Sequence, residues 1–255
     1  MGLFSFLTKN KQPRKNTGET LPPLDMGLLH TDMHSHIIPG IDDGSKTMEM
    51  SVGLIRSLSD MGYKKIIATP HVQSDTFCNK PADLPAKLES VKEAVEKAGI
   101  DIALDLAAEF LLDDDIVARL LRNESLTFGN NYLLVELSMY LRPMGLEGWL
   151  FDLESHGYNL VLAHPERYRF WTQKPASYEK LKDRGILFQI NINSLAGFYD
   201  SNVRKTAEWL IDNNMVDFVG TDTHNERYIE GLQIARTMPY FHKIANSRQL
   251  LNNTL

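Results

Sequence analysis

The stretch TDMHSHIIPGIDDG, residues 31–44, decides how the rest of the chain can be interpreted. It begins as a β-rich run, carries His34 and His36 two positions apart, and continues into a turn with Asp42, Asp43 and Gly44. Alternate residues of a strand face the same side, so both histidines can point into one site. Imidazole and carboxylate groups are metal ligands, although an Asx turn that caps the next helix also explains the two aspartates.

The same rhythm of a short β-rich run followed by a helix-like segment continues along the chain. The further runs are KKIIATPH, DIALDLAAEF, YLLVELS, NLVLAHPE, ILFQININ and VDFVGTDTH. Seven such units predict a parallel α/β architecture, and their number and even spacing favour a barrel over an open sheet. We expect residues 239–255 to form a closing helix with a frayed end.

Most of these runs end on a side chain that can bind a metal ion. The nine candidate ligands are His34, His36, Asp43, His71, Glu109, Glu136, His164, Asp222 and His224. Each alone can be an ordinary core or loop residue, and His30, His156 and His242 show no strand-end pattern. In a parallel barrel, however, all the C-terminal strand ends lie on one face, and buried acids without cations would be strongly unfavourable. The pattern therefore predicts a metal site.

Composition bounds the class of protein. The chain has 255 residues, of which 43% are hydrophobic, and this is enough for one large domain. The formal net charge of −6 argues against nucleic acid as the main partner. No apolar run approaches the roughly 20 residues of a membrane span. Cys78 is the single cysteine, so no internal disulfide is possible, and we expect a reducing, cytoplasmic location.

The first 28 residues differ from the rest of the chain. A short apolar stretch is followed by basic and polar residues, which predicts a flexible basic arm over 1–28 and a folded domain over 29–255. Contact of the arm with a membrane surface or another subunit is the alternative, and an oligomer is compatible with the sequence.

The ligand types and nearby arginines indicate phosphoester hydrolysis. Imidazole and carboxylate ligands without thiolate suit manganese, iron or zinc, and nine ligands suffice for two or three ions. Clustered ions serve hydrolysis of phosphate esters. Arg142, Arg167 and Arg227 lie near strand ends and can bind phosphate, although a surface ion pair is the alternative for each. Cys78 lacks the arginine partner of thiol-based tyrosine phosphatases, because Leu84 stands six residues after it.

The segments DMHSHIIPGIDDG, ATPH, AAEF, LLVELS, LAHPERY and GTDTHN resemble motifs of the polymerase-and-histidinol-phosphatase (PHP) superfamily. Over residues 29–234 the chain is similar to the bacterial manganese-dependent tyrosine phosphatases of capsular and exopolysaccharide synthesis. The resemblance implies a distorted seven-stranded (β/α) barrel and three metal ions, with magnesium a further alternative to manganese. The implied ligand sets are His34, His36, Glu109 and Asp222; His71, Glu109, Glu136 and His164; and Asp43 and His224.

The resemblance also implies roles for other residues and a substrate. Arg167 matches a phosphate-binding arginine, Arg227 is a second candidate, and His224 can stabilise the leaving group. The implied substrate is the phosphotyrosine tail of a membrane-associated tyrosine kinase. A small-molecule phosphatase of the histidinol-phosphate type and a non-catalytic metal-binding module are the alternatives.

Overall fold

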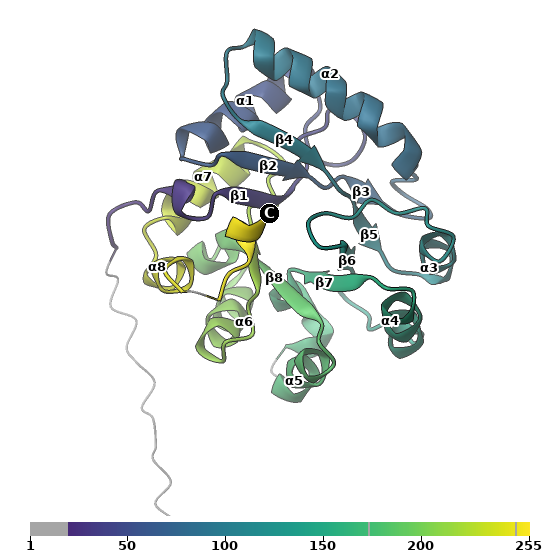
Figure 1. Cartoon of the computed structure of the whole chain (residues 1–255). Coiled ribbons are helices and arrows are strands. Elements are labelled where there is room, and N and C mark those ends of the chain that lie inside the picture. Colours follow the sequence, from purple (N-terminus) through teal and green to yellow (C-terminus); the bar gives the residue numbers. More distant parts are fainter. Residues whose placement is uncertain (1–19, 173, 248) are drawn as a thin grey trace, which may run out of the picture.

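The computed structural model describes residues 20–172, 174–247 and 249–255, and it shows parallel strands surrounded by helices (Figure 1). The strands are β1 (Thr31–Ser35), β2 (Lys65–Ala68), β3 (His71–Val72), β4 (Ala103–Leu106), β5 (Glu109–Leu111), β6 (Tyr132–Glu136), β7 (Asn159–Ala163), β8 (Leu187–Asn191) and β9 (Phe218–Gly220). The α-helices are α1 (Met48–Asp60), α2 (Leu84–Lys97), α3 (Asp114–Leu120), α4 (Leu146–Ser155), α5 (Pro175–Asp183), α6 (Ser201–Asp212), α7 (Glu226–Ala235) and α8 (Pro239–Ala245). Short 3₁₀ helices are η1 (Met26–Leu28), η2 (Pro81–Asp83), η3 (Pro165–Arg167), η4 (Arg169–Trp171), η5 (Ile192–Ala196) and η6 (Asn252–Thr254).

The strands form two parallel sheets, with orders β1-β2-β4 and β3-β5-β6-β7-β8-β9. All seven predicted runs contain strand, which confirms the parallel α/β class, but they form nine strands because two runs are interrupted. The second run breaks between β2 and β3 at Pro70, which has no N–H to donate to a ladder. The third breaks beside it, between β4 and β5, at Ala107 and Ala108. The breaks divide the ladder into two sheets.

The first and last strands lie side by side through a few contacts. An isolated parallel bridge joins Ser35 to Thr223. The main-chain N of Asp222 donates to His34 O at 2.8 Å, and the N of His36 donates to Thr223 O at 3.0 Å. The structure thus differs from a regular closed barrel of seven unbroken strands, although β1 and β9 are brought together at their C-terminal ends.

Side-chain caps fix where several helices begin. Thr47 accepts a hydrogen bond from Met50 N at the start of α1, and Asp113 accepts one from Ile116 N at the start of α3. Asp200 and Asn225 cap α6 and α7 in the same way. Each cap satisfies an amide that has no partner within its helix. These short polar residues therefore fix the position at which each helix begins after its loop.

Apolar side chains fill the interior between the strands below the predicted site. This inner core consists of Met33, Ile67, Ala107, Phe128, Leu134, Val161, Ala163 and Phe218. Leu134 and Glu136 lie two positions apart on β6, so they share a face. Leu134 belongs to the apolar core and Glu136 lines a polar pocket at the C-terminal end of the strands. Strand β6 thus contributes an apolar side chain to the inner core and, two residues later, a polar side chain to the pocket.

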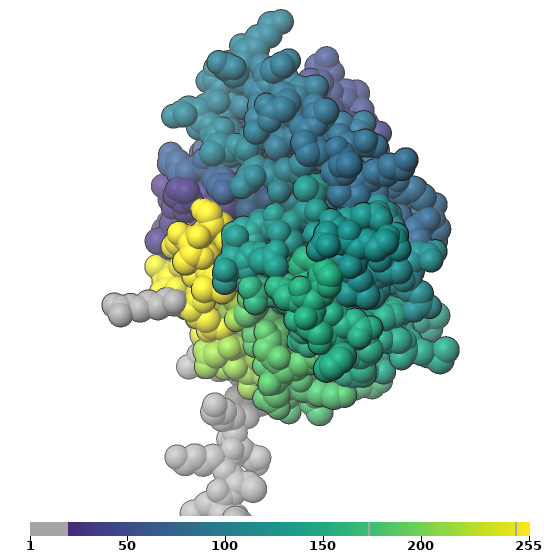
Figure 2. Space-filling view, turned by 45° about the vertical axis from the view of Figure 1, so that its right-hand side comes forward, coloured from purple at the N-terminus to yellow at the C-terminus, as the bar shows by residue number. Residues whose placement is uncertain are grey.

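The chain terminus closes the opposite end of the strands. Helix α8 begins at Pro239, which confirms the predicted closing helix, but it ends at Ala245 and the residues after it are not a frayed continuation of it. Asn252 is fully buried instead: its Nδ2 donates to Thr31 O and Val219 O, and its Oδ1 accepts from Val219 N. Leu251 and Leu255 pack against the inner core. Figure 2 shows these last residues (yellow) beside the teal segment before β6.

Residues 1–19, most of the predicted arm, lie outside the described residues. Residues 20–28 were assigned to the same arm and pack on the domain: Leu21 N donates to Thr237 O at 2.9 Å, and Met26 is fully buried. Within the described part of the chain, no helix has the length and apolar character needed to cross a bilayer.

Candidate metal centre

The nine predicted ligands meet at the C-terminal ends of the strands. All except Asp43 are buried. A pocket of about 290 Å³ opens onto them, and Arg167 lines it together with seven of the nine, namely Asp43, His71, Glu109, Glu136, His164, Asp222 and His224. Residues separated by up to 190 positions in sequence therefore share one small volume.

At the base of the pocket, two imidazoles face two carboxylates. The Nε2 atoms of His34 in β1 and of His36, which directly follows that strand, lie 3.2 Å apart, so both rings point to the same side as predicted. Glu109 Oε2 lies 3.2 Å from His34 Nε2 and 3.3 Å from His36 Nε2. Asp222 Oδ1 lies 3.4 Å from each of the same two nitrogens. Four potential ligand atoms thus surround one point.

A second group lies beside it and shares Glu109. His71 Nδ1 is 3.2 Å from both Glu109 Oε2 and Glu136 Oε1. His164 Nε2 is 2.9 Å from Glu109 Oε1 and 3.8 Å from Glu136 Oε2. Because both oxygens of Glu109 face histidines of different groups, this carboxylate is placed to bridge two positions.

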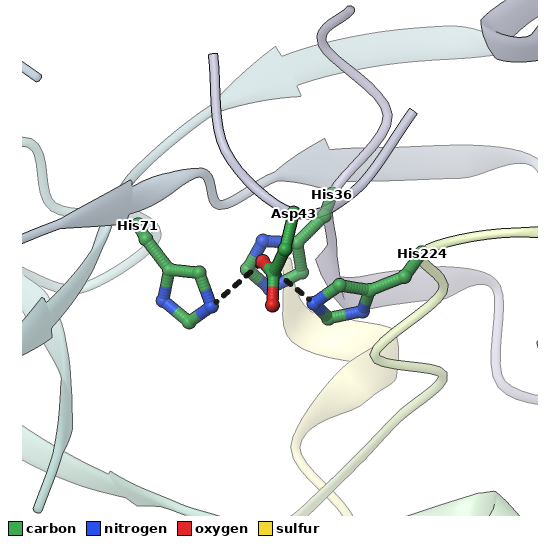
Figure 3. Close-up of side chains that lie close together, drawn as sticks. All are labelled: His36, Asp43, His71 and His224. Atoms are coloured by element: carbon green, nitrogen blue, oxygen red, sulfur yellow. Dashed lines mark ion pairs between the residues drawn. The ribbon is translucent and has the colours of Figure 1, made fainter. Parts of the chain in front are cut away.

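The third group lies at the mouth of the pocket (Figure 3). Asp43 Oδ1 is 3.4 Å from His71 Nε2 and 3.3 Å from His224 Nε2, and the ring of His36 stacks on that of His224 with centroids 4.0 Å apart. His36, Asp43, His71 and His224 can each offer one ligand atom within 4.8 Å of the others. The geometry therefore adds His36 and His71 to the pair Asp43 and His224 at this position.

Several ligand atoms of the centre lack ordinary partners. Among the described residues, His71 Nδ1, His164 Nδ1 and Glu109 Oε2 are buried without a hydrogen bond. Buried polar atoms without partners are unfavourable. His71 Nδ1 and Glu109 Oε2 form close ion pairs instead, and a donor set of imidazole nitrogens and carboxylate oxygens in this arrangement fits divalent cations.

The protonation of the histidines reflects the crowding of carboxylates. Burial alone would lower the pKa of His71, but the charge of Glu109 and the hydrogen bonds of Asp43 and Glu136 raise it to about 10. Burial would raise the pKa of Glu109, but the charges of His34 and His71 hold it well below its usual range. The pKa values of His34 and His36 are raised as well, so without bound cations protons on His34, His36 and His71 balance the acids.

Two candidate ligands have a strained backbone. His164 has φ 35° and Asp222 has φ 52°, in the left-handed region that residues other than glycine rarely adopt. Such a conformation costs about 1–3 kcal/mol and persists where the surrounding structure imposes it. His164 directly follows β7, and Asp222 lies just past the end of β9. At each position the left-handed conformation turns the side chain from the strand end into the centre.

Comparison with known proteins identifies the family. The model of the family described as "Capsular polysaccharide synthesis, CpsB/CapC" matches residues 30–247. The chain belongs to the CpsB/CapC family. It is 28% identical to the tyrosine-protein phosphatase YwqE of Bacillus subtilis, over 87% of this chain and 91% of that protein. It is 30% identical to the tyrosine-protein phosphatase CpsB of Streptococcus agalactiae, over 76% of this chain and 82% of that protein.

Solved structures agree with this assignment. A crystal structure reported for YwqE of Bacillus subtilis and CpsB of Streptococcus pneumoniae, described as unique metal-dependent tyrosine phosphatases, superposes with a TM-score of 0.78. The match covers 86% of this chain and 89% of that chain, at 27% identity. A histidinol phosphate phosphatase of Lactococcus lactis superposes with a TM-score of 0.52 at 14% identity, which shows a shared fold.

Of the three predicted phosphate-binding arginines in this CpsB/CapC chain, one reaches the pocket. Arg167 lines it, donates to Asp222 Oδ2 at 3.1 Å, and lies over the Tyr199 ring. Arg142 forms an ion pair with Glu147 at 2.7 Å, and Arg227 lies over the Phe198 ring. Within the described residues, neither of these two lines the pocket. Cys78 is exposed and lies outside the same pocket.

Strand β8 carries site residues that the sequence prediction missed. Gln189 Oε1 lies 2.9 Å from His34 Nδ1, so a proton on that nitrogen leaves Nε2 free toward the centre. Gln189 Nε2 donates to Asn191 Oδ1, and Asn191 Nδ2 donates to Asp222 Oδ2 at 2.6 Å. We call Gln189 and Asn191 the amide pair. The available signal was two amides at alternate positions near the end of ILFQININ.

Asp42 plays a comparable part for His36. Its Oδ2 accepts from His36 Nδ1 at 2.9 Å and from His71 N at 3.1 Å, while its Oδ1 accepts from Gly44 N. The Asx turn given as an alternative in the sequence analysis is therefore present at Asp42, but α1 is capped by Thr47 and not by either aspartate. The same carboxylate also directs His36 Nε2 toward Glu109 and Asp222.

Proposed function

We propose that this CpsB/CapC protein is a metal-dependent protein-tyrosine phosphatase of capsular or exopolysaccharide synthesis, built on a distorted barrel of the PHP type. The observation that carries the proposal is the convergence of nine histidines and acids in overlapping groups, seven of which line one pocket with Arg167. The substrate class is supported by YwqE and CpsB, which are tyrosine-protein phosphatases.

The cofactor we propose is manganese, as two or three ions. His34, His36, Glu109 and Asp222 would hold the first, and His71, Glu109, Glu136 and His164 the second. Asp43 and His224 would hold the third, with His36 or His71 as a further neighbour. When bound, such ions acidify water and neutralise phosphate charge.

The chain's own residues bind the substrate and position the ligands. Arg167 is placed to donate hydrogen bonds to phosphoryl oxygens, since its guanidinium already reaches Asp222 at the pocket wall. His224 Nδ1 lies 2.8 Å from Asp222 O, which leaves Nε2 facing Asp43. The same Nε2 would serve either as a ligand or as a proton donor, so these two roles of His224 exclude each other. A tyrosine leaving group has a pKa of about 10, and it therefore needs a proton donor less than an alkyl alcohol does.

The protein substrate we propose is the phosphotyrosine tail of a membrane-associated tyrosine kinase that acts in polysaccharide export. The family's place in capsular polysaccharide synthesis supports this choice of partner. Removal of phosphate from that tail would reset the kinase.

A substrate panel tests the proposal. Purified protein is loaded with manganese and assayed on a phosphotyrosine peptide, the matching phosphoserine peptide and histidinol phosphate. We expect kcat/KM to be highest for the phosphotyrosine peptide. Comparable values for histidinol phosphate would favour the small-molecule alternative, and no hydrolysis of any substrate at full metal content would favour a binding module.

A further inference from the structure

A group of large apolar side chains is exposed in the loop between β6 and α4. Tyr140 is 67% exposed, Leu141 is 75% exposed and Met144 is 100% exposed. We call these three residues the apolar rim. In the described part of the chain, the other exposed large hydrophobic residues are Leu28, Phe151 and Ile234, which lie on three different elements. Grouped exposed apolar residues mark interaction surfaces, whereas single ones need no explanation.

The apolar rim is continuous with the candidate metal centre. Strand β6 ends at the candidate ligand Glu136, and Leu137, Ser138 and Met139 then line the same pocket. Tyr140 and Leu141 follow directly, so they lie within about 4–8 Å of the pocket lining along the chain. Arg169 N donates to Met139 O at 3.0 Å, which ties this loop to the segment that carries His164 and Arg167.

Cationic groups accompany the apolar rim. The Arg169 guanidinium lies 5.3 Å from the centre of the Tyr140 ring. Arg142 pairs with Glu147 on the first turn of α4, which holds the middle of the loop near that helix. Figure 1 places α4 outside the strands, beside β7. The surface thus combines apolar area with positive charge at the edge of the pocket.

We propose that the apolar rim binds the polypeptide next to the phosphotyrosine, taking an apolar side chain within roughly three residues of it. This inference rests on the proposed function and specifies which protein substrates the pocket accepts. Leu141 and Met144 are not among the residues that line the pocket, so a small aryl phosphate bound in it does not need them. An extended peptide that leaves the pocket beside Met139 must pass over them, with Arg169 near any acidic neighbour.

The test is the double variant Leu141→Ser/Met144→Ser, with Ile234→Ser on α7 as the matched control. All three side chains are more than half exposed, so folding should be unaffected. The substrates are p-nitrophenyl phosphate and two phosphotyrosine peptides, with leucine or serine two residues after the phosphotyrosine. We expect kcat/KM of the manganese-loaded double variant to fall about tenfold for the leucine peptide, through KM, and to stay within about twofold for p-nitrophenyl phosphate.

A binding measurement separates this inference from the proposed function. Fluorescence anisotropy gives the Kd of the dephosphorylated leucine peptide, which the enzyme does not consume. A weaker Kd in the double variant supports the apolar rim even if no phosphatase activity is found. Unchanged peptide kinetics and Kd would overturn it, as would an equal loss on p-nitrophenyl phosphate. Dissociation of an oligomer by the double variant, with peptide binding unchanged, would instead assign the rim to contact between copies of this chain.

Discussion

The two ends of the strands differ in how their buried polar groups are satisfied. At the N-terminal end, Asn252 satisfies the main chain of Thr31 and Val219, and Leu251 and Leu255 pack against the inner core. At the C-terminal end, buried histidines and acids crowd together, and some of their atoms have no partner. The first end is consistent with a stabilising role and the second with binding cations. Function in this fold is therefore expected to be separable from stability.

The largest effect is expected for a substitution of Glu109, at the C-terminal end of the strands. The variant Glu109→Gln keeps the size of the side chain but removes the charge that faces four histidines, namely His34, His36, His71 and His164. We expect loss of more than one metal ion and a fall in kcat of at least about a hundredfold. Plasma emission spectroscopy and turnover on a phosphotyrosine peptide measure both. Metal content and rate near wild type would show that Glu109 is an ordinary core residue.

A substitution at the N-terminal end of the strands should lower the stability of the protein and leave its activity unchanged. Asn252→Ala removes three buried hydrogen bonds and leaves main-chain groups of Thr31 and Val219 unsatisfied. We expect the free energy of unfolding to fall by about 2–3 kcal/mol while kcat at a temperature below the transition stays unchanged. Denaturant titration gives the first value. A large loss of kcat in a variant of unchanged stability would refute the separation of the two ends.

A smaller effect tests the amide pair. Gln189→Leu keeps much of the volume but removes the acceptor for His34 Nδ1 and the donor to Asn191. We expect manganese affinity to weaken about ten- to a hundredfold, with kcat at saturating metal less affected. Calorimetric titration reports the affinity, and Gln249→Leu serves as control because Gln249 contacts Val216 O away from the centre. Equal effects of the two substitutions would show that Gln189 does not position His34.

The last effect, at most about tenfold for each pH unit and proton, is the dependence of metal affinity on pH. In the cation-free centre the pKa of His71 is raised to about 10, so its ring is protonated at pH 7. A metal ion must displace that proton, and its apparent affinity should rise with pH between 6 and 8, by up to about tenfold per unit for each proton released. Calorimetry in buffers of different ionisation enthalpy counts the protons. Binding without proton release would contradict this account of the histidines.

Sequence patterns predicted the strand regions because their apolar runs are long and bounded by helix caps such as Thr47 and Asp200. The strand ends also indicated which polar residues come together, since parallel strands bring them to one face. The break at Pro70 has a signal in the sequence, since proline has no N–H for a ladder, whereas the break beside it at Ala107 depends on a neighbouring strand. The direction of Arg142 toward Glu147 and the contacts of Gln189 and Asn252 depend on residues far away in sequence.

The central claim is that the nine clustered side chains hold divalent cations required for phosphatase activity. The most direct measurement is a titration of metal-free protein with manganese, with bound metal by elemental analysis and turnover of a phosphotyrosine peptide recorded on the same samples. We predict no turnover without metal, and turnover that appears as at least two ions bind per chain. Full turnover in protein that elemental analysis shows to be metal-free would contradict the claim.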